Sequence, residues 1–278
     1  MSSDVVWIDG ALCPAESARV SPFDHGLLTG DGVFETLVVY GGEPFAVRRH
    51  LERLAFSCKG LGLACPDAGL LRDALSSVIS ANGLDHGRLR ITVTGGVAPL
   101  GSDRGGAADQ MVVVAGAPLG EWPETADVVV VPWPRNERGA LAGLKTTSYG
   151  ENVVALAYAK ERGAGEAIFA NTVGSLCEGT GSNVFLSMGD GRLITPTLAS
   201  GCLAGVTRAL VLEVTGAVEE DVPVSALSSA SEAFLTSTTR AVQPIGTVDG
   251  VRLGAAPGPL SLAASAGFDA LVARTLDP

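Results

Sequence analysis

The chain of 278 residues is long enough for about two domains of ordinary size. Its 46% hydrophobic and 18% charged residues exclude a disordered or collagen-like protein. Its 30 acidic and 19 basic side chains give a net charge of −11, which argues against nucleic acid or an anionic membrane surface as a partner. Only Lys59, Lys145 and Lys160 are lysines, so each is a candidate for a role that arginine does not fill.

The cysteines and the N-terminus bear on the cellular compartment. Cys13, Cys58, Cys65, Cys177 and Cys202 form no CxxC pair, which is poor spacing for zinc and favours free thiols in a reducing compartment. The first residues lack the basic and apolar regions of a signal peptide, and no uncharged run reaches the ~18 residues of a spanning helix. We therefore expect a soluble, cytoplasmic protein without a bound metal.

Strand and helix patterns alternate through the first part of the chain. Strands are expected at 5–8, 33–39, 88–94 and 111–115, with a hairpin turn at 40–42. Helices are expected at 49–61 and 67–81. Their inward residues are expected to be Leu51, Leu54, Ala55 and Cys58 in the first helix, and Leu70, Leu71, Leu75 and Val78 in the second.

The segment 116–123, punctuated by glycine and proline, is the best candidate for a linker. Beyond it, strands are expected at 127–131, 166–170 and 183–186, and helices at 152–162, 206–214 and 260–274. We therefore predict an α/β (α+β) protein with a first domain at 1–117, a linker at 118–125 and a second domain at 126–278.

Lys145 stands among small and hydroxylic residues in Gly-Leu-Lys-Thr-Thr-Ser-Tyr, just before an expected helix. A solvated surface lysine would also suit this position. The chain uses arginine at nearly every other basic position, so a lysine here indicates a site that needs an amine able to lose its proton. A guanidinium cannot lose its proton in this way. Nucleophilic amine chemistry needs such a group, for example in a Schiff base with a carbonyl compound or with pyridoxal phosphate (PLP).

Glu178 follows among small residues, immediately before an apolar strand. It is either a turn acid that contacts water or a carboxylate held against a cationic ring nitrogen, which a PLP enzyme needs to keep its ring protonated. The neighbouring Gly-Thr-Gly completes no phosphate-binding glycine motif.

Two further segments suit a phosphate group. The segment 200–208 runs into an apolar helix and offers backbone N–H groups, the hydroxyl of Thr207 and the positive end of a helix. The segment 234–240 ends in a hydroxyl-rich turn. The alternatives are an ordinary glycine-containing helix start and an ordinary ST-turn.

Together these segments resemble those of the class IV aminotransferases, the fold-type IV PLP enzymes. That family includes branched-chain aminotransferases, D-amino acid aminotransferases and aminodeoxychorismate lyases. The resemblance runs from Gly-Asp-Gly-Val-Phe-Glu-Thr at 30–36 and His-Leu-Glu-Arg-Leu at 50–54 to Thr-Ser-Thr-Thr-Arg-Ala-Val-Gln-Pro at 236–244. It implies an N-terminal α/β domain, a C-terminal pseudo-barrel domain, PLP between them, and a homodimer.

The resemblance also implies roles for individual residues. Lys145 resembles the Schiff-base lysine, which moves the proton between the substrate Cα and the cofactor. Glu178 resembles the partner of the ring nitrogen. Arg53 resembles the arginine on the cofactor phosphate; without the resemblance it would be an ordinary helix arginine whose stem covers apolar surface. The rest of the phosphate cup is implied at Val206, Thr207 and Thr238.

The expected substrate site departs from the family patterns. Branched-chain enzymes often have a tyrosine where Thr29 stands, and their tyrosine after the lysine motif matches Tyr149 only with a shift of one residue. D-amino acid enzymes have a tyrosine where Phe34 stands and an Arg-Gly pair near 94–96. Both are missing here, which argues against a typical D-amino acid enzyme.

A substrate carboxylate is best bound by an arginine that donates two parallel N–H bonds. The candidates are Arg90 on an expected strand, Arg104 in a loop and Arg240 after the threonine turn, and we favour Arg240. Phe34, Tyr149 and Thr239 complete the expected substrate site.

The resemblance favours a PLP-dependent aminotransferase that moves an amino group from an amino acid to a 2-oxo acid through a Lys145 Schiff base. An aminodeoxychorismate lyase, which releases pyruvate and 4-aminobenzoate, begins in the same way, so the shared motifs do not separate the two. A relative that binds without catalysis is a third class. The expected partners are these small molecules, with no nucleic acid and no membrane.

Overall fold

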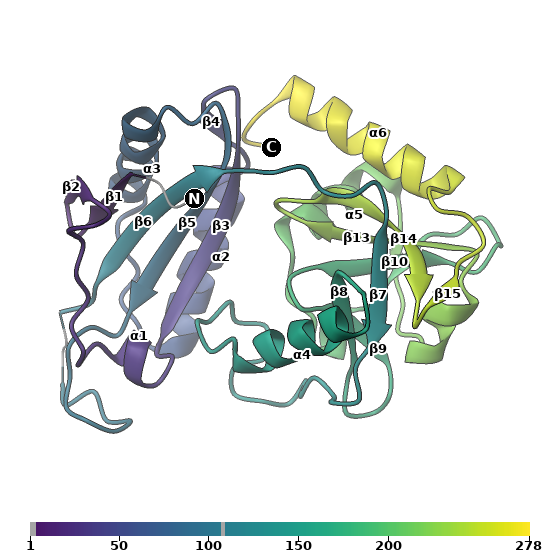
Figure 1. Cartoon of the computed structure of the whole chain (residues 1–278), viewed down its shortest axis with the longest axis horizontal. Coiled ribbons are helices and arrows are strands. Elements are labelled where there is room, and N and C mark those ends of the chain that lie inside the picture. Colours follow the sequence, from purple (N-terminus) through teal and green to yellow (C-terminus); the bar gives the residue numbers. More distant parts are fainter. Residues whose placement is uncertain (1–3, 107–108) are drawn as a thin grey trace. The chain divides into compact units, whose positions relative to one another are not determined.

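A computed structural model of the chain describes residues 4–106 and 109–278 (Figure 1). Residues 1–3 and 107–108 lie outside the described residues. The first three belong to the expected first domain and to the N-terminal segment in which no signal peptide was expected. The chain divides into two compact units. Unit 1 extends to residue 120 and also contains 144–149 and 275–278, whereas unit 2 contains 121–143 and 150–274.

Unit 1 is an antiparallel sheet with two helices packed on one face. Its strands follow the order β2-β1-β6-β5-β3-β4. Its elements are β1 (Val5–Ile8), β2 (Ala11–Pro14), α1 (His25–Leu28), β3 (Gly32–Tyr40), β4 (Glu43–Pro44), α2 (Val47–Leu61), α3 (Ala68–Asn82), β5 (His86–Thr94) and β6 (Val112–Pro118). The strands and helices expected for this part are confirmed, although β6 includes residues 116–118 of the expected linker segment.

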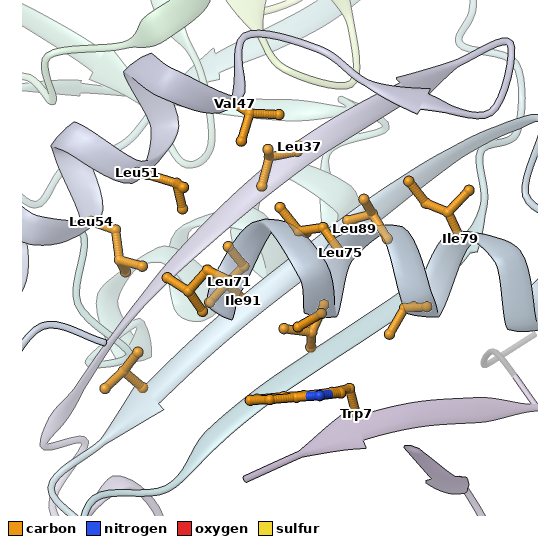
Figure 2. Packing of buried hydrophobic residues seen from close by; sticks show 14 of the residues in the cluster. Trp7, Leu37, Val47, Leu51, Leu54, Leu71, Leu75, Ile79, Leu89 and Ile91 are labelled. Carbon is orange, nitrogen blue, oxygen red and sulfur yellow. The ribbon is translucent and has the colours of Figure 1, made fainter. Parts of the chain in front are cut away.

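The core of unit 1 forms where alternate strand residues meet the apolar stripes of α2 and α3, as Figure 2 shows. The residues labelled there are Trp7, Leu37, Val47, Leu51, Leu54, Leu71, Leu75, Ile79, Leu89 and Ile91. The expectation for Leu70 was wrong, because this side chain is 45% exposed. Leu71, Leu75 and Val78 already follow the i, i+4, i+7 spacing of one face, and Leu70 lies about 100° around the helix from Leu71.

The start of α2 is held by residues from the far end of the sequence. Ala46 occupies the N-cap with a left-handed backbone (φ 55°) and gives the helix no side-chain cap. The carboxylate of Asp277 accepts the N–H of Arg48 instead (2.8 Å). The N–H of Ala46 also donates to the carbonyl oxygen of Leu276 (2.6 Å). The segment 275–278 therefore supplies the cap that α2 lacks.

Unit 2 is built on a longer sheet of mostly short strands. Its elements are β7 (Ala126–Val130), α4 (Gly150–Glu161), β8 (Glu166–Ala170), β9 (Leu176–Gly179), β10 (Asn183–Ser187), β11 (Ile194–Thr195), η1 (Leu198–Ser200), α5 (Val206–Thr215), β12 (Val218–Glu219), η2 (Val224–Ser229), β13 (Glu232–Ser237), β14 (Ala241–Val248), β15 (Val251–Arg252) and α6 (Pro259–Arg274). The expected helices at 152–162, 206–214 and 260–274 are confirmed as α4, α5 and α6.

The strand path of unit 2 turns back on itself. The order is β12-β11-β10-β13-β14-β7-β8-β9, with β15 paired to β14. The N–H of Gly179 at the end of β9 donates to the carbonyl oxygen of Ser182 (2.7 Å), immediately before β10. This brings the β9 end of the path back to β10, as in a barrel-like sheet. None of the helices in the described residues is long and apolar enough to cross a membrane.

Candidate active site

Lys145 lies in a short extended segment that continues the sheet along the edge of β3. The N–H of Phe34 donates to the carbonyl oxygen of Lys145 (3.0 Å), and the N–H of Thr147 donates to that of Gly32 (2.8 Å). The N–H of Lys145 donates to the hydroxyl of Ser57 on α2 (3.1 Å). Hydrogen bonds therefore fix the main chain of Lys145 on both sides, which limits where its amine can reach.

Three candidates of unit 1, Lys145, Arg90 and Tyr149, lie around the ring of Phe34. Nζ of Lys145 lies 4.5 Å from the ring centroid, and Cζ of Arg90 lies 3.7 Å from the same centroid. Tyr149 meets the ring edge-on, with the centroids 5.1 Å apart. Nε of Arg90 also donates to the hydroxyl of Thr92 (3.1 Å). A cationic guanidinium and an amine beside one aromatic ring suit an anionic substrate group.

Arg53 is held on the opposite face of β3. Glu35 follows Phe34 and therefore points the other way, toward α2. Its Oε1 accepts a hydrogen bond from Nε of Arg53 (2.7 Å), and its Oε2 accepts one from Nη2 of Arg53 (2.8 Å) and one from Nδ1 of His50 (2.6 Å). The Glu35 side chain is 0% exposed. The sequence reasoning missed Glu35, although an acidic residue within an apolar strand was a usable signal.

Charge and burial together fix the protonation of this network. Burial by itself raises the pKa of Glu35, but the Arg53 guanidinium and His50 outweigh burial and hold that pKa well below its usual range. Burial lowers the pKa of His50, against the opposing effect of Glu35. Because an ionised carboxylate can only accept, His50 carries its proton on Nδ1. His50 is thus a neutral donor to a buried anion.

Glu178 is anchored within unit 2 by a main-chain donor and an arginine. The N–H of Leu203 donates to Oε2 of Glu178 (2.9 Å), and Nε of Arg135 lies 3.4 Å from Oε1. Arg135 stacks on Phe169, with Cζ 4.2 Å from the ring centroid, and donates to Oδ1 of Asn152 (3.0 Å). The sequence reasoning missed Arg135, since nothing in its local sequence marks a long-range partner of Glu178. These contacts fix the orientation of the carboxylate.

The start of α5 has the features of an anion cradle. Gly205 is its N-cap and provides no side-chain hydrogen bond to the first N–H groups, and Thr207 is buried behind it. A Cβ at Gly205 would overlap Oδ1 of Asn183, which pairs across the sheet with Thr236. The Thr236 hydroxyl is buried and has no hydrogen-bond partner in the described residues. These residues fit a phosphate group, because a helix N-terminus with spare N–H groups and a hydroxyl binds anions.

The remaining candidates of unit 2 lie in the turn after β13 or at the start of α5. Thr238 and Thr239 occupy the turn after β13, and Val206 opens α5. Arg240 pairs through Nη2 with Oε2 of Glu166 (2.9 Å), and both side chains are buried. The sequence reasoning did not identify Glu166 as a partner of Arg240.

The three arginine candidates for a substrate carboxylate differ in their partners. Arg104 binds the carboxylate of Asp31 through Nε (2.6 Å), and Arg240 is neutralised by Glu166. No carboxylate within the described part of the chain pairs with Arg90. Nor do the described residues bring three metal-ligating side chains together anywhere.

The chain is similar to known proteins over almost its whole length. Residues 32–248 match the family model of amino-transferase class IV. The chain is 32% identical over 259 residues to a protein of Methanocaldococcus jannaschii assigned as a branched-chain-amino-acid aminotransferase, with 88% of each chain covered. Aminodeoxychorismate lyase of Bacillus subtilis is 29% identical over 272 residues, with 91% of this chain and 90% of that protein covered. The crystal structure of branched-chain amino acid aminotransferase of Escherichia coli matches with a TM-score of 0.91 at 27% identity, covering 97% of this chain and 94% of that one.

Proposed function

Because this chain belongs to the class IV aminotransferase family, whose members depend on PLP, we propose that it binds PLP and transfers an amino group from an amino acid to a 2-oxo acid. The observation that carries the proposal is the fixed position of Lys145. Its main chain is bonded to Phe34 and Ser57, and its amine lies 4.5 Å from the Phe34 ring. An amine held in this way can act as a nucleophile and then as a proton carrier.

In this proposal, Lys145 anchors the cofactor covalently and moves the proton at the substrate Cα. When bound, PLP supplies an electron-accepting ring that stabilises the charge left at Cα. Glu178 keeps the ring nitrogen protonated, which its contacts with Leu203 and Arg135 support by holding the carboxylate in one orientation. Phe34 and Ser57 keep the Lys145 segment in place so that its amine reaches the same atom in each step.

We assign the cofactor phosphate to Arg53, Val206, Thr207 and Thr238. The start of α5 supports this assignment, because its first N–H groups have no side-chain cap and Gly205 lets Asn183 lie against the start of the helix, where a Cβ would overlap its Oδ1. The buried Thr236 hydroxyl, which has no protein partner in the described residues, is a further donor for the phosphate.

We assign the substrate carboxylate to Arg90 rather than to Arg240. The charge of Arg240 is already balanced by Glu166, whereas Arg90 stacks on Phe34, donates to the hydroxyl of Thr92 and pairs with no carboxylate in the described residues. A guanidinium without an acidic partner retains its donors for an incoming carboxylate. Tyr149 and Thr239 complete the proposed substrate site. Branched-chain amino acids, named in two of the similar proteins, are the first donors to test.

Aminodeoxychorismate lyase activity is the second candidate, favoured by the similarity to the Bacillus subtilis lyase. The two activities differ in co-substrate. A panel of amino donors with 2-oxoglutarate tests transfer, and aminodeoxychorismate alone tests the lyase. Pyruvate formed without consumption of a 2-oxo acid favours the lyase, whereas a 2-oxo acid formed from the donor supports the transaminase.

We propose further that the protein acts as a homodimer in the cytoplasm, a compartment suited to its free cysteines. Unit 1 carries an exposed apolar patch of Phe23, Leu27, Val97 and Leu100, with Leu100 75% exposed. The N–H of Ala98 donates to the carbonyl oxygen of Phe23 (3.3 Å), so these side chains belong to adjoining segments. Such a patch is typical of an interface. Sedimentation of Leu100→Asp against the unaltered protein tests this proposal, which predicts a shift toward monomer.

Covalent attachment of PLP tests the central assignment. The purified protein should develop visible absorption with PLP, and borohydride should fix the cofactor on the peptide that contains Lys145. Lys145→Ala should show neither effect. Lys160→Ala, an exposed lysine in α4, is the matched control and should behave like the unaltered protein. Absence of the band in the unaltered protein would refute the proposed function.

A further inference from the structure

The buried charges of Glu35 and Arg53, which form a network with His50, are not required for the packing of unit 1. Glu35 lies on the face of β3 that also buries Val33 and Leu37, where an apolar residue would pack without a desolvation penalty. A buried ion pair contributes little to stability compared with apolar residues of similar volume. The carboxylate is therefore better explained by what it does to its partners.

The geometry shows what it does to Arg53. Two parallel bonds, from Nε to Oε1 (2.7 Å) and from Nη2 to Oε2 (2.8 Å), fix both the plane and the rotation of the guanidinium. The bond from Nδ1 of His50 to Oε2 (2.6 Å) in turn fixes the carboxylate. His50 and Arg53 are both on α2, so two residues of one helix bind the same strand residue.

We propose that Glu35 is the positioning residue of Arg53: it holds the guanidinium in the single orientation that binds the phosphate of PLP, and His50 holds Glu35. This inference rests on the proposed role of Arg53. Glu35 touches neither the cofactor nor the reacting atoms in this scheme and acts only through Arg53. Lys145 also acts on the network, because its charge lowers the pKa of His50.

Glu35→Gln is the direct test because it keeps the size of the side chain. Glu35 accepts from three N–H groups, two of Arg53 and one of His50. An amide has one acceptor oxygen, and its NH2 group must face a donor. His50 can change its tautomer to accept from that group, but Arg53 cannot. Whichever way the amide lies, one N–H of Arg53 loses its partner on residue 35, and the two parallel bonds no longer fix the plane and rotation of the guanidinium.

The readout is the affinity for PLP compared with that for pyridoxal, which lacks the phosphate. Both are titrated by their absorption on binding. In Glu35→Gln we expect the Kd of PLP to rise about ten- to a hundredfold, the effect of losing a hydrogen bond to a charged group. The Kd of pyridoxal should change less than about twofold, because the lost bond concerns only the phosphate. Glu232→Gln is the control: it alters another buried carboxylate, which binds the N–H of Ser261 (3.0 Å), and should leave the ratio unchanged.

Three results would overturn the inference. Equal weakening of PLP and pyridoxal would place the role of Glu35 in the fold of unit 1. Tighter PLP binding would mean that Glu35 acts only by repelling the phosphate. An unchanged ratio would mean that Arg53 needs no positioning. If Glu35→Gln does not fold, the same ratio of the Kd values for PLP and pyridoxal is measured in Glu35→Asp. This variant keeps the charge, but its shorter side chain moves the carboxylate away from Arg53. If the unaltered protein binds neither compound, the proposed function fails before Glu35 is tested.

Discussion

Gly205→Ala probes the cradle at the start of α5 with a single methyl group. The backbone of Gly205 (φ −65°, ψ 134°) suits alanine, so the substitution introduces no backbone strain. The new Cβ overlaps Oδ1 of Asn183, whose Nδ2 donates to the carbonyl oxygen of Leu203 (2.9 Å). The overlap is relieved only if Asn183 rotates or the first turn of α5 moves.

The magnitude follows from the burial of Asn183, which is 5% exposed. Rotating its amide leaves buried polar groups unpaired, which costs about 1–3 kcal/mol. Replacing glycine by alanine also restricts the unfolded chain and returns about 0.4–1 kcal/mol. We therefore expect the free energy of unfolding to fall by about 1–2 kcal/mol, and the Kd of PLP to rise about tenfold through displacement of the first N–H groups.

Urea unfolding of the cofactor-free protein and titration with PLP and pyridoxal measure the two effects. Gly165→Ala is the matched control, since a Cβ there meets open space. It should leave the free energy of unfolding unchanged or raise it by up to about 1 kcal/mol. If Gly205→Ala is as stable as Gly165→Ala and keeps its preference for PLP over pyridoxal, the cradle does not hold the phosphate.

Other predictions concern charge. In Glu178→Gln, turnover should fall about a hundredfold (~2.7 kcal/mol) while PLP stays bound, and unchanged turnover would remove Glu178 as the ring partner. Arg90→Gln should raise the KM for the amino donor about tenfold or more with little change in the Kd of PLP. A rise in KM seen only in Arg240→Gln would assign the substrate carboxylate to Arg240 instead. Stability should also fall as pH drops below about 6.5, because the pKa of His50 is lowered in the fold, so the unfolded state takes up its proton first. The contribution is at most ~1.36 kcal/mol per pH unit and should disappear from the unfolding profile of His50→Gln. A second decline below about 4.5, where the unfolded state protonates Glu35 first, should disappear in Glu35→Gln.

The long periodic elements could be predicted from the sequence, whereas the short ones could not. The stripes of α2 and α3 repeat over 15 residues each, so their inward faces follow from spacing, with Leu70 the exception. The two-residue strands β11 and β12 are too short to show an alternation, and they exist because their neighbours in the sheet pair with them.

The candidate site shows the same division between local and long-range information. Lys145 and Glu178 stand out because their neighbours are small and their residue types suit one kind of chemistry. The proposed preference for Arg90 over Arg240 could not be predicted from the sequence, because it rests on the pairing of Arg240 with Glu166, a residue remote in the chain. A pairing of this kind exists only once the strands have assembled.

The discontinuity of unit 1 has a consequence for synthesis on the ribosome. The part of unit 1 up to residue 120 leaves the ribosome first, yet the segment with Lys145 and the cap supplied by Asp277 follow much later. Until then α2 lacks its cap and Ser57 lacks the main-chain donor of Lys145. A nascent chain therefore emerges with its amine-bearing segment still undocked, and the first unit to be translated is the last to be completed.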